Sequence, residues 1–143
     1  MRFWDSSAVV PLLVRQPASD RVDEWVAEEP EIALWTLTPV EIVSALWRLV
    51  RDGALDETTA RQSELRAREL IAASYLIVDV EGTKGLASRL LRVHPLRAAD
   101  ALQLAAALLW AGGAPQGRTL HTLDERLAGA ARREGFDVPT TTQ

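Results

Sequence analysis

The sequence predicts an α/β fold in which helices cover both faces of a central, mostly parallel β-sheet, giving three layers. Short runs of β-branched and aromatic residues alternate along the chain with longer segments of helical periodicity, which is the pattern of consecutive βαβ units. The composition, with 48% hydrophobic and 25% charged residues in 143 positions, is typical of an ordinary folded domain. We therefore expect a single α/β/α domain over residues 1–143, with a sheet of about five strands.

The expected elements follow one another in regular alternation. Strands are expected at residues 2–5, 32–37, 75–80 and 118–122, with a further edge strand at 136–138. Helices are expected at residues 7–14, 19–26, 38–53, 56–74, 83–93, 97–112 and 124–133.

Local signals mark several helix ends. The segment Thr-Pro-Val-Glu at 38–41 combines an expected N-cap Thr, a first-turn Pro and a Glu at the third helical position, which together form a capping box. Ser19 and Asp56 are expected to cap two other helices, and Gly135 is expected to end the last one.

The composition excludes several classes of function. The chain has no Cys and only 2 His, which excludes disulfide scaffolds, Cys-ligated zinc, iron-sulfur clusters and thiol catalysis, and is compatible with the reducing cytoplasm. A net charge of −4 argues against a broad basic surface for non-specific duplex binding. No N-terminal signal and no apolar run near the roughly 18 residues of a membrane span are present, so we expect a cytoplasmic protein without membrane association.

Four acidic residues are expected at the carboxyl ends of the strands, where ligand sites of parallel sheets lie. Asp5 ends the first strand, Glu41 lies in the first turn after the second, Asp100 in the first turn of the Ala-rich helix, and Asp124 after the fourth strand. Converging carboxylates repel one another unless a cation is present, and oxygen ligands without Cys or placed His favour Mg²⁺ or Mn²⁺. One or two such ions would orient a phosphodiester and activate water for attack on phosphorus.

Each acid also has a purely structural interpretation. Glu41 could complete the capping box, and Asp5 and Asp124 could cap helices. Asp100 is the hardest to explain in this way, because its neighbours are Ala and Leu, and burying a lone carboxylate is costly. Asp79 also ends an expected strand but has no hydroxyl beside it, so it is a weaker candidate for the site and the sequence leaves its role open.

Four segments carry a family resemblance: Asp-Ser-Ser at 5–7, Thr-Pro-Val-Glu at 38–41, Leu-Arg-Ala-Ala-Asp-Ala-Leu-Gln-Leu-Ala at 96–105 and Thr-Leu-Asp-Glu-Arg-Leu at 122–127. In this order, over nearly the whole chain, the sequence resembles the PIN-domain ribonucleases, and within them the VapC-type toxins of bacterial toxin-antitoxin pairs. The resemblance implies endonucleolytic cleavage of RNA that depends on Mg²⁺ or Mn²⁺. It also implies a homodimer and a VapB-like antitoxin partner.

By position in the matching segments, the resemblance implies that the catalytic, metal-binding acids are Asp5, Glu41, Asp100 and Asp124. It also implies that Ser6 and Thr122 are the accompanying hydroxyls. The sequence departs from many relatives at Gln103, where they carry His. Because that change spares the acids, we expect it to alter substrate contacts at most.

A second surface is expected to bind the antitoxin. Leu46, Trp47 and Val50 lie on the helix after Glu41, and they could form an apolar groove for an amphipathic partner helix. The alternative interpretation places these side chains in the core.

Two other functions compete with the nuclease. A receiver or haloacid-dehalogenase type phosphotransfer domain shares the expected architecture, but it needs an acidic pair or an Asp-x-Asp motif and a placed Lys. Here Asp5 is followed by Ser-Ser, and the only Lys, Lys84, begins a helix. A PIN-like binding module without catalysis is the remaining alternative.

Overall fold

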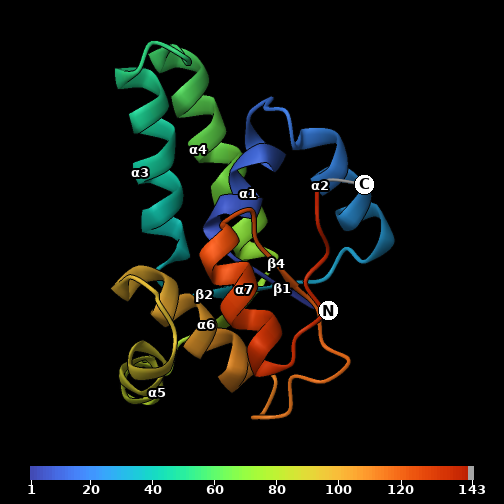
Figure 1. Cartoon of the computed structure of the whole chain (residues 1–143). Helices are drawn as coiled ribbons and strands as arrows, with labels where there is room; N and C mark the ends of the chain where they lie inside the picture. The colour runs from blue at the N-terminus through green and yellow to red at the C-terminus, as the bar shows by residue number, and fades with distance from the viewer. Residues whose placement is uncertain (142–143) are drawn as a thin grey trace.

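The computed structural model describes residues 1–141 (Figure 1). Its strands are β1 (Arg2–Trp4), β2 (Ile32–Trp35), β3 (Tyr75–Ile77) and β4 (Leu120–His121). Its helices are α1 (Ser6–Leu13), α2 (Ser19–Glu28), α3 (Thr38–Arg51), α4 (Glu57–Ala72), α5 (Val80–Val93), α6 (Ala98–Trp110) and α7 (Glu125–Glu134).

The strands form one parallel sheet with the order β3-β2-β1-β4. The parallel α/β prediction is therefore confirmed, but the sheet of residues 1–141 has four strands, not five. The expected edge strand at 136–138 is reduced to a single parallel bridge between Thr119 and Asp137. Pairing does not extend further because the chain reaches Pro139, which has no backbone N–H to donate.

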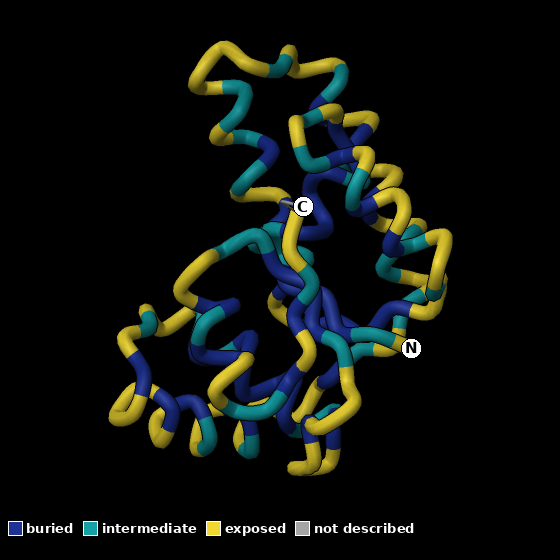
Figure 2. Tube along the Cα trace, turned by 45° about the vertical axis from the view of Figure 1, so that its right-hand side comes forward, coloured by how far each residue is buried: buried dark blue, intermediate teal, exposed yellow. Residues whose placement is uncertain are grey.

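Side chains alternate between the two faces of the sheet and divide the core in two. Phe3 and Trp35 pack with residues of α5, α6 and α7, whereas Trp4 and Leu34 pack with residues of α1 to α4. Helices thus cover both faces, and Figure 2 shows the buried trace running through the middle of the molecule. This arrangement is the predicted three-layer α/β/α architecture.

Two of the expected N-caps are wrong. Thr38 is the first residue of α3, whose N-cap is Leu37, without a side-chain hydrogen bond. Ser19 similarly lies inside α2, and its hydroxyl donates to the Pro11 carbonyl at 2.8 Å. Both hydroxyls are buried, and their tertiary or loop partners compete successfully with the role of a cap.

Other caps fall where the sequence predicts them. Asp56 accepts a hydrogen bond from the Thr59 backbone N–H, and Gly135 ends α7 with a left-handed φ of 114°. Asp79 does not end a strand, because β3 stops at Ile77; it caps α5 by accepting from the Gly82 N–H at 2.8 Å. Helix α5 therefore begins earlier than predicted.

No helix in the described part of the chain is long and apolar enough to cross a membrane.

Candidate acidic active site

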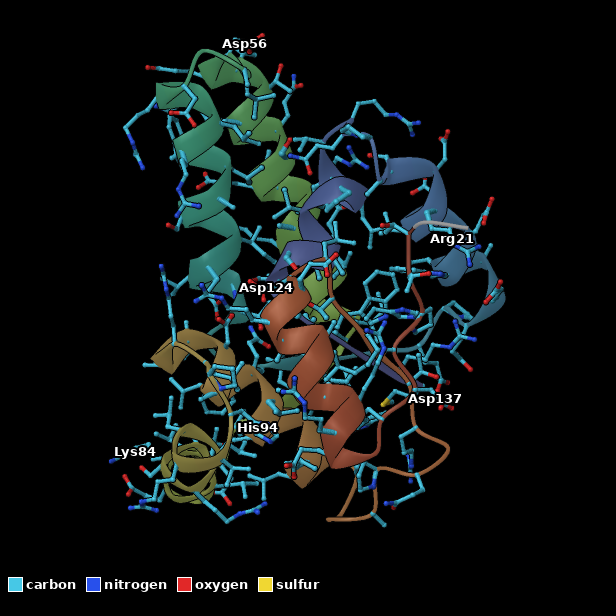
Figure 3. All side chains as sticks on the ribbon, in the orientation of Figure 1. Arg21, Asp56, Lys84, His94, Asp124 and Asp137 are labelled. Carbon is cyan, nitrogen blue, oxygen red and sulfur yellow. The ribbon has the colours of Figure 1, made fainter. Side chains whose placement is uncertain are left out.

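All four predicted acids lie where a helix begins. Asp5 is the N-cap of α1 directly after β1, and Asp124 is the N-cap of α7 shortly after β4. Glu41 and Asp100 lie in the first turns of α3 and α6. Figure 3 shows Asp124 at the N-terminal end of α7, close to the middle of the molecule. The partial positive charge of these helix N-termini favours carboxylates at such positions.

Asp5 is the most deeply placed of these acids, with 3% of its surface exposed. Its Oδ2 accepts hydrogen bonds from the backbone N–H and hydroxyl of Ser7 and, at 2.8 Å, from the hydroxyl of Thr122. Burial raises the pKa of Asp5, the hydrogen bonds from Ser7 and Thr122 lower it in part, and the charge of Asp124 raises it again. The side chain therefore caps α1 and is also affected by the charge of Asp124.

Glu41 is held from two sides. Its Oε2 accepts from the Ser6 hydroxyl at 3.0 Å, and its Oε1 accepts from the Gln103 amide at 2.9 Å. Burial raises the pKa of Glu41, the Gln103 hydrogen bond opposes this shift, and the charges of Asp5 and Asp100 raise the pKa further. The capping-box interpretation of Glu41 is wrong, because its oxygens bond to side chains of other elements.

Asp100 is half-buried at the start of α6. Burial, followed by the charges of Asp124 and Asp5, raises its pKa to about 6, while Arg97 and Arg126 oppose the shift. Asp100 and Asp124 line the same surface hollow, and the hydroxyls of Ser6 and Thr122 each contact two of the acid-bearing residues. The fold therefore places the four predicted acids near one another, although they come from four separate elements.

The two predicted hydroxyls each connect a pair of acids. Thr122 donates to Asp5 and accepts from the Asp124 backbone N–H at 3.0 Å. Ser6 donates to Glu41, and its oxygen also lies 3.4 Å from Asp5 Oδ1.

Ser7, from the Asp-Ser-Ser segment, makes a contact that the sequence did not predict: its hydroxyl accepts from the Leu123 backbone N–H at 2.9 Å and so connects the end of β1 to the segment after β4. The expectation for Gln103 was wrong, because its side chain is completely buried and does not reach the surface where a substrate would bind. The signal was available, because Gln103 lies three positions after Asp100 on the same face of a helix.

The donor chemistry of the site fits a hard divalent cation. Within residues 1–141, none of the four carboxylates forms an ion pair with a basic side chain. Hydroxyl and amide groups hold the oxygens of Asp5 and Glu41. Burial, followed by the charges of neighbouring acids, raises the pKa values of Asp5, Glu41 and Asp100. A cation is the physical complement of such a set. Over the same residues, however, no three acidic or His side chains are already close enough to hold one ion.

Three of the four acids, Glu41, Asp100 and Asp124, line two adjacent hollows on the surface. One, of about 450 Å³, is lined by Asp100 and Asp124 together with Arg97 and Arg126. The other, of about 460 Å³, is lined by residues that include Glu41 and Arg48. Ala99 borders both hollows. The site is therefore accessible to an extended ligand.

The expected antitoxin-binding residues differ in exposure. Leu46 is completely buried, so its side chain belongs to the core, as do Trp25 and Trp35. Trp47 is half-buried; its indole N–H donates to Glu64 of α4 at 3.0 Å. Val50 is also partly exposed. Docking of an antitoxin at Trp47 and Val50 stays a prediction.

The two His side chains lie outside the acidic site. His94 ends α5 and lies 2.7 Å from Glu134 of α7. His121 is buried and stacks on Trp25 with ring centroids 4.2 Å apart. Burial, aided by Arg2 and Arg21, lowers the pKa of His121 to about 3, so the ring is neutral.

A parallel α/β sheet with an acidic site at the carboxyl ends of its strands defines the class of protein. Residues 2–133 match the PIN domain family, and the chain belongs to that family. No curated protein sequence matches the chain.

Solved structures share the whole fold at low sequence identity. A toxin-antitoxin complex from Klebsiella pneumoniae contains a chain that is 18% identical, with a TM-score of 0.68 and coverage of 100% of this chain and 99% of that one. FitAcB from Neisseria gonorrhoeae is 17% identical with a TM-score of 0.67, covering 99% and 98%. The sarcin-ricin loop cleaving toxin VapC20 of Mycobacterium tuberculosis is 15% identical with a TM-score of 0.63, covering 91% and 95%.

Proposed function

We propose that this PIN-domain protein is a metal-dependent endoribonuclease that acts as the toxin of a VapBC-type toxin-antitoxin pair. The observation that carries the proposal is the proximity of four carboxylates from four separate elements, none of which forms an ion pair with a basic side chain within residues 1–141. Such a set is costly to keep together unless its function needs a cation there.

Asp5, Glu41, Asp100 and Asp124 would hold Mg²⁺, with Mn²⁺ as an alternative. When bound, the ion supplies Lewis-acid chemistry that activates water for attack on phosphorus and stabilises the leaving oxygen. The protein supplies orientation: Thr122 and Ser7 fix Asp5, and Ser6 and Gln103 fix Glu41. Asp100 faces the surface hollow, where substrate and solvent can reach it.

Arginine side chains around the site suit a phosphate backbone. Arg97 and Arg126 line the hollow that contains Asp100 and Asp124, and Arg48 lines the hollow that contains Glu41. All three are exposed, and none forms an ion pair in the part of the chain that the structure describes. Guanidinium groups bind phosphate through paired hydrogen bonds, which supports an extended RNA substrate across the site.

The proposed partners are a VapB-like antitoxin and a second copy of the chain. Toxin-antitoxin complexes among the structural neighbours support the antitoxin. For the homodimer, the support is an exposed apolar surface: Leu37 and Val40 at the start of α3 and Val78 and Val80 near the start of α5. A hydrogen bond from Thr36 N–H to the Ile77 carbonyl holds these two segments side by side.

A PIN-like binding module without catalysis is the second candidate. One observation favours it: within residues 1–141 no three potential ligands form a ready-made metal site. In that case the acids would bind a basic peptide rather than an ion.

The deciding experiment is cleavage of a mixed RNA pool by antitoxin-free protein with Mg²⁺, with Mn²⁺ and with EDTA. Asp100→Asn, purified in the same way, is the matched variant because it is nearly isosteric. The nuclease predicts cleavage that needs metal and disappears in Asp100→Asn, while the fold and antitoxin binding are retained. Equal behaviour of wild type and variant would favour the binding module.

A further inference from the structure

Gln103 is an unusual residue for its place in α6. The helix is otherwise built from Ala, Leu, Trp and one Asp, and Gln103 is completely buried in it. Burying an amide costs free energy unless its polar atoms find partners. A glutamine kept in such a place therefore calls for an explanation in its contacts.

Those contacts lead to the acidic site. The Gln103 Nε2 donates to Glu41 Oε1 at 2.9 Å and to Thr38 Oγ1 at 3.0 Å, using both of its hydrogens on α3. The orientation of the amide follows from chemistry, because an ionised carboxylate only accepts hydrogen bonds and so must face the NH₂ group. The amide oxygen is left buried without a hydrogen-bond partner. The amide thus orients Glu41, although its own oxygen has no hydrogen-bond partner within residues 1–141.

Gln103 also links two helices that otherwise pack mainly against other elements. Helix α6 packs against α5, β2 and α7, whereas α3 packs against α4 and α1. Asp100 and Glu41 lie on these two helices, and Gln103 is one turn from Asp100 on the same face. Its side chain therefore connects the helix that carries Asp100 to the carboxylate of Glu41.

We propose that Gln103 is a positioning residue: its amide fixes the Glu41 carboxylate and sets the separation of Glu41 from Asp100. Ser6 holds the other oxygen of Glu41, so the carboxylate is fixed from both sides. The inference rests on the proposed function, because it gives Gln103 a role toward the cation that Glu41 would bind. It replaces the expectation that Gln103 contacts the substrate.

The test is Mn²⁺ binding to the EDTA-treated full chain, measured by calorimetry. Gln103→Met keeps the length and volume of the side chain but removes both donors. We expect it to weaken Mn²⁺ binding by about 10-fold or more, as is usual when a group that orients a metal ligand is lost. Thr83→Val is the matched control, because Thr83 is equally buried and its hydroxyl has no partner in residues 1–141. We expect Thr83→Val to bind Mn²⁺ as wild type does.

A double-mutant cycle separates positioning from general stability. If Gln103 acts through Glu41, Gln103→Met has no further effect on Mn²⁺ affinity in a Glu41→Ala background. Wild-type affinity in Gln103→Met, or an equal loss in both backgrounds, would overturn the inference while leaving the nuclease intact. Failure of the wild type itself to bind Mn²⁺ or cleave RNA would instead overturn the proposed function, and this inference with it. Gln103→Leu repeats the test if Gln103→Met does not fold.

Discussion

The hydroxyl of Thr122 donates a 2.8 Å hydrogen bond to Oδ2 of Asp5, across 117 positions of sequence. The Thr122 Oγ1 in turn accepts a hydrogen bond from the backbone N–H of Asp124 at 3.0 Å. One buried hydroxyl therefore connects the end of β1, the end of β4 and the N-cap of α7. It holds two of the four acids in a fixed relation.

Thr122→Val should impair the site without unfolding the protein, because the two side chains have nearly the same shape. We expect RNA cleavage at fixed Mg²⁺ to fall by about 10-fold to 100-fold, and the Mg²⁺ concentration needed for half-maximal rate to rise. Metal-titrated cleavage assays measure both. Thr83→Val, the same change at a buried position outside the site, should leave the titration unchanged. A wild-type titration for Thr122→Val would contradict this role.

Asp100 should make the metal-free protein less stable as the pH rises. Its pKa is near 3.8 when unperturbed and about 6 in the fold, so between these values the folded state binds more protons than the unfolded state. The free energy of unfolding therefore falls as the pH rises through this window, and the penalty is complete above it. Asp100→Asn removes the penalty and should be more stable than wild type by about 1 kcal/mol at pH 7.5 in EDTA, allowing for solvent screening.

Denaturant unfolding at pH 4 and pH 7.5 checks this prediction, since the advantage of Asp100→Asn should disappear at pH 4. Adding Mg²⁺ at pH 7.5 should stabilise the wild type more than the variant. Glu57→Gln, an exposed change on α4, is the control and should alter neither difference. An advantage for Asp100→Asn that is independent of pH would contradict the electrostatic explanation.

Trp47→Ala tests the predicted antitoxin surface. Trp47 is half-buried, joins α3 to α4 through Glu64 and lies beneath the guanidinium of Arg61 at 5.4 Å. We expect its loss to weaken antitoxin binding by at least about 10-fold, as for aromatic residues at the centre of interfaces. Calorimetric titration with the antitoxin measures this change, with Tyr75→Ala on the exposed edge strand as control. Unchanged affinity in a folded variant would remove Trp47 from the interface.

Two glycines should respond in opposite directions to Ala. Gly135 has a φ of +114°, and an added Cβ would lie 2.9 Å from the Gln116 side chain, so Gly135→Ala should destabilise the fold by about 1–2 kcal/mol. Gly85 lies inside α5 with nothing within 4 Å of an added Cβ. Gly85→Ala should therefore stabilise the fold by up to about 1 kcal/mol. Thermal unfolding of both variants measures the contrast, and equal signs would refute it.

Much of the fold follows from local patterns in the sequence. Periodicity and caps such as Asp56 and Gly135 depend on residues within a few positions of one another, and the structure confirms them. The placement of the four acids could also be predicted from the sequence, because each lies near a predicted strand end or helix start. The absence of a fifth strand from the described part of the chain could not be predicted, since residues 136–138 contain suitable side chains but form only one bridge.

The partners of the polar side chains were decided by tertiary structure. Thr38 and Glu41 fit a local capping box, yet both bond to Gln103, more than 60 positions away. Leu46 and Trp47 are adjacent apolar residues, and only packing decides that the first is buried while the second is partly exposed. The sequence by itself determined the fold class, the helices, four of the strands and the position of each acid along the chain, because backbone preferences and hydrophobic periodicity act over short distances. Packing alone decided which groups meet, because a hydrogen bond forms only where the fold brings a donor within about 3 Å of an acceptor.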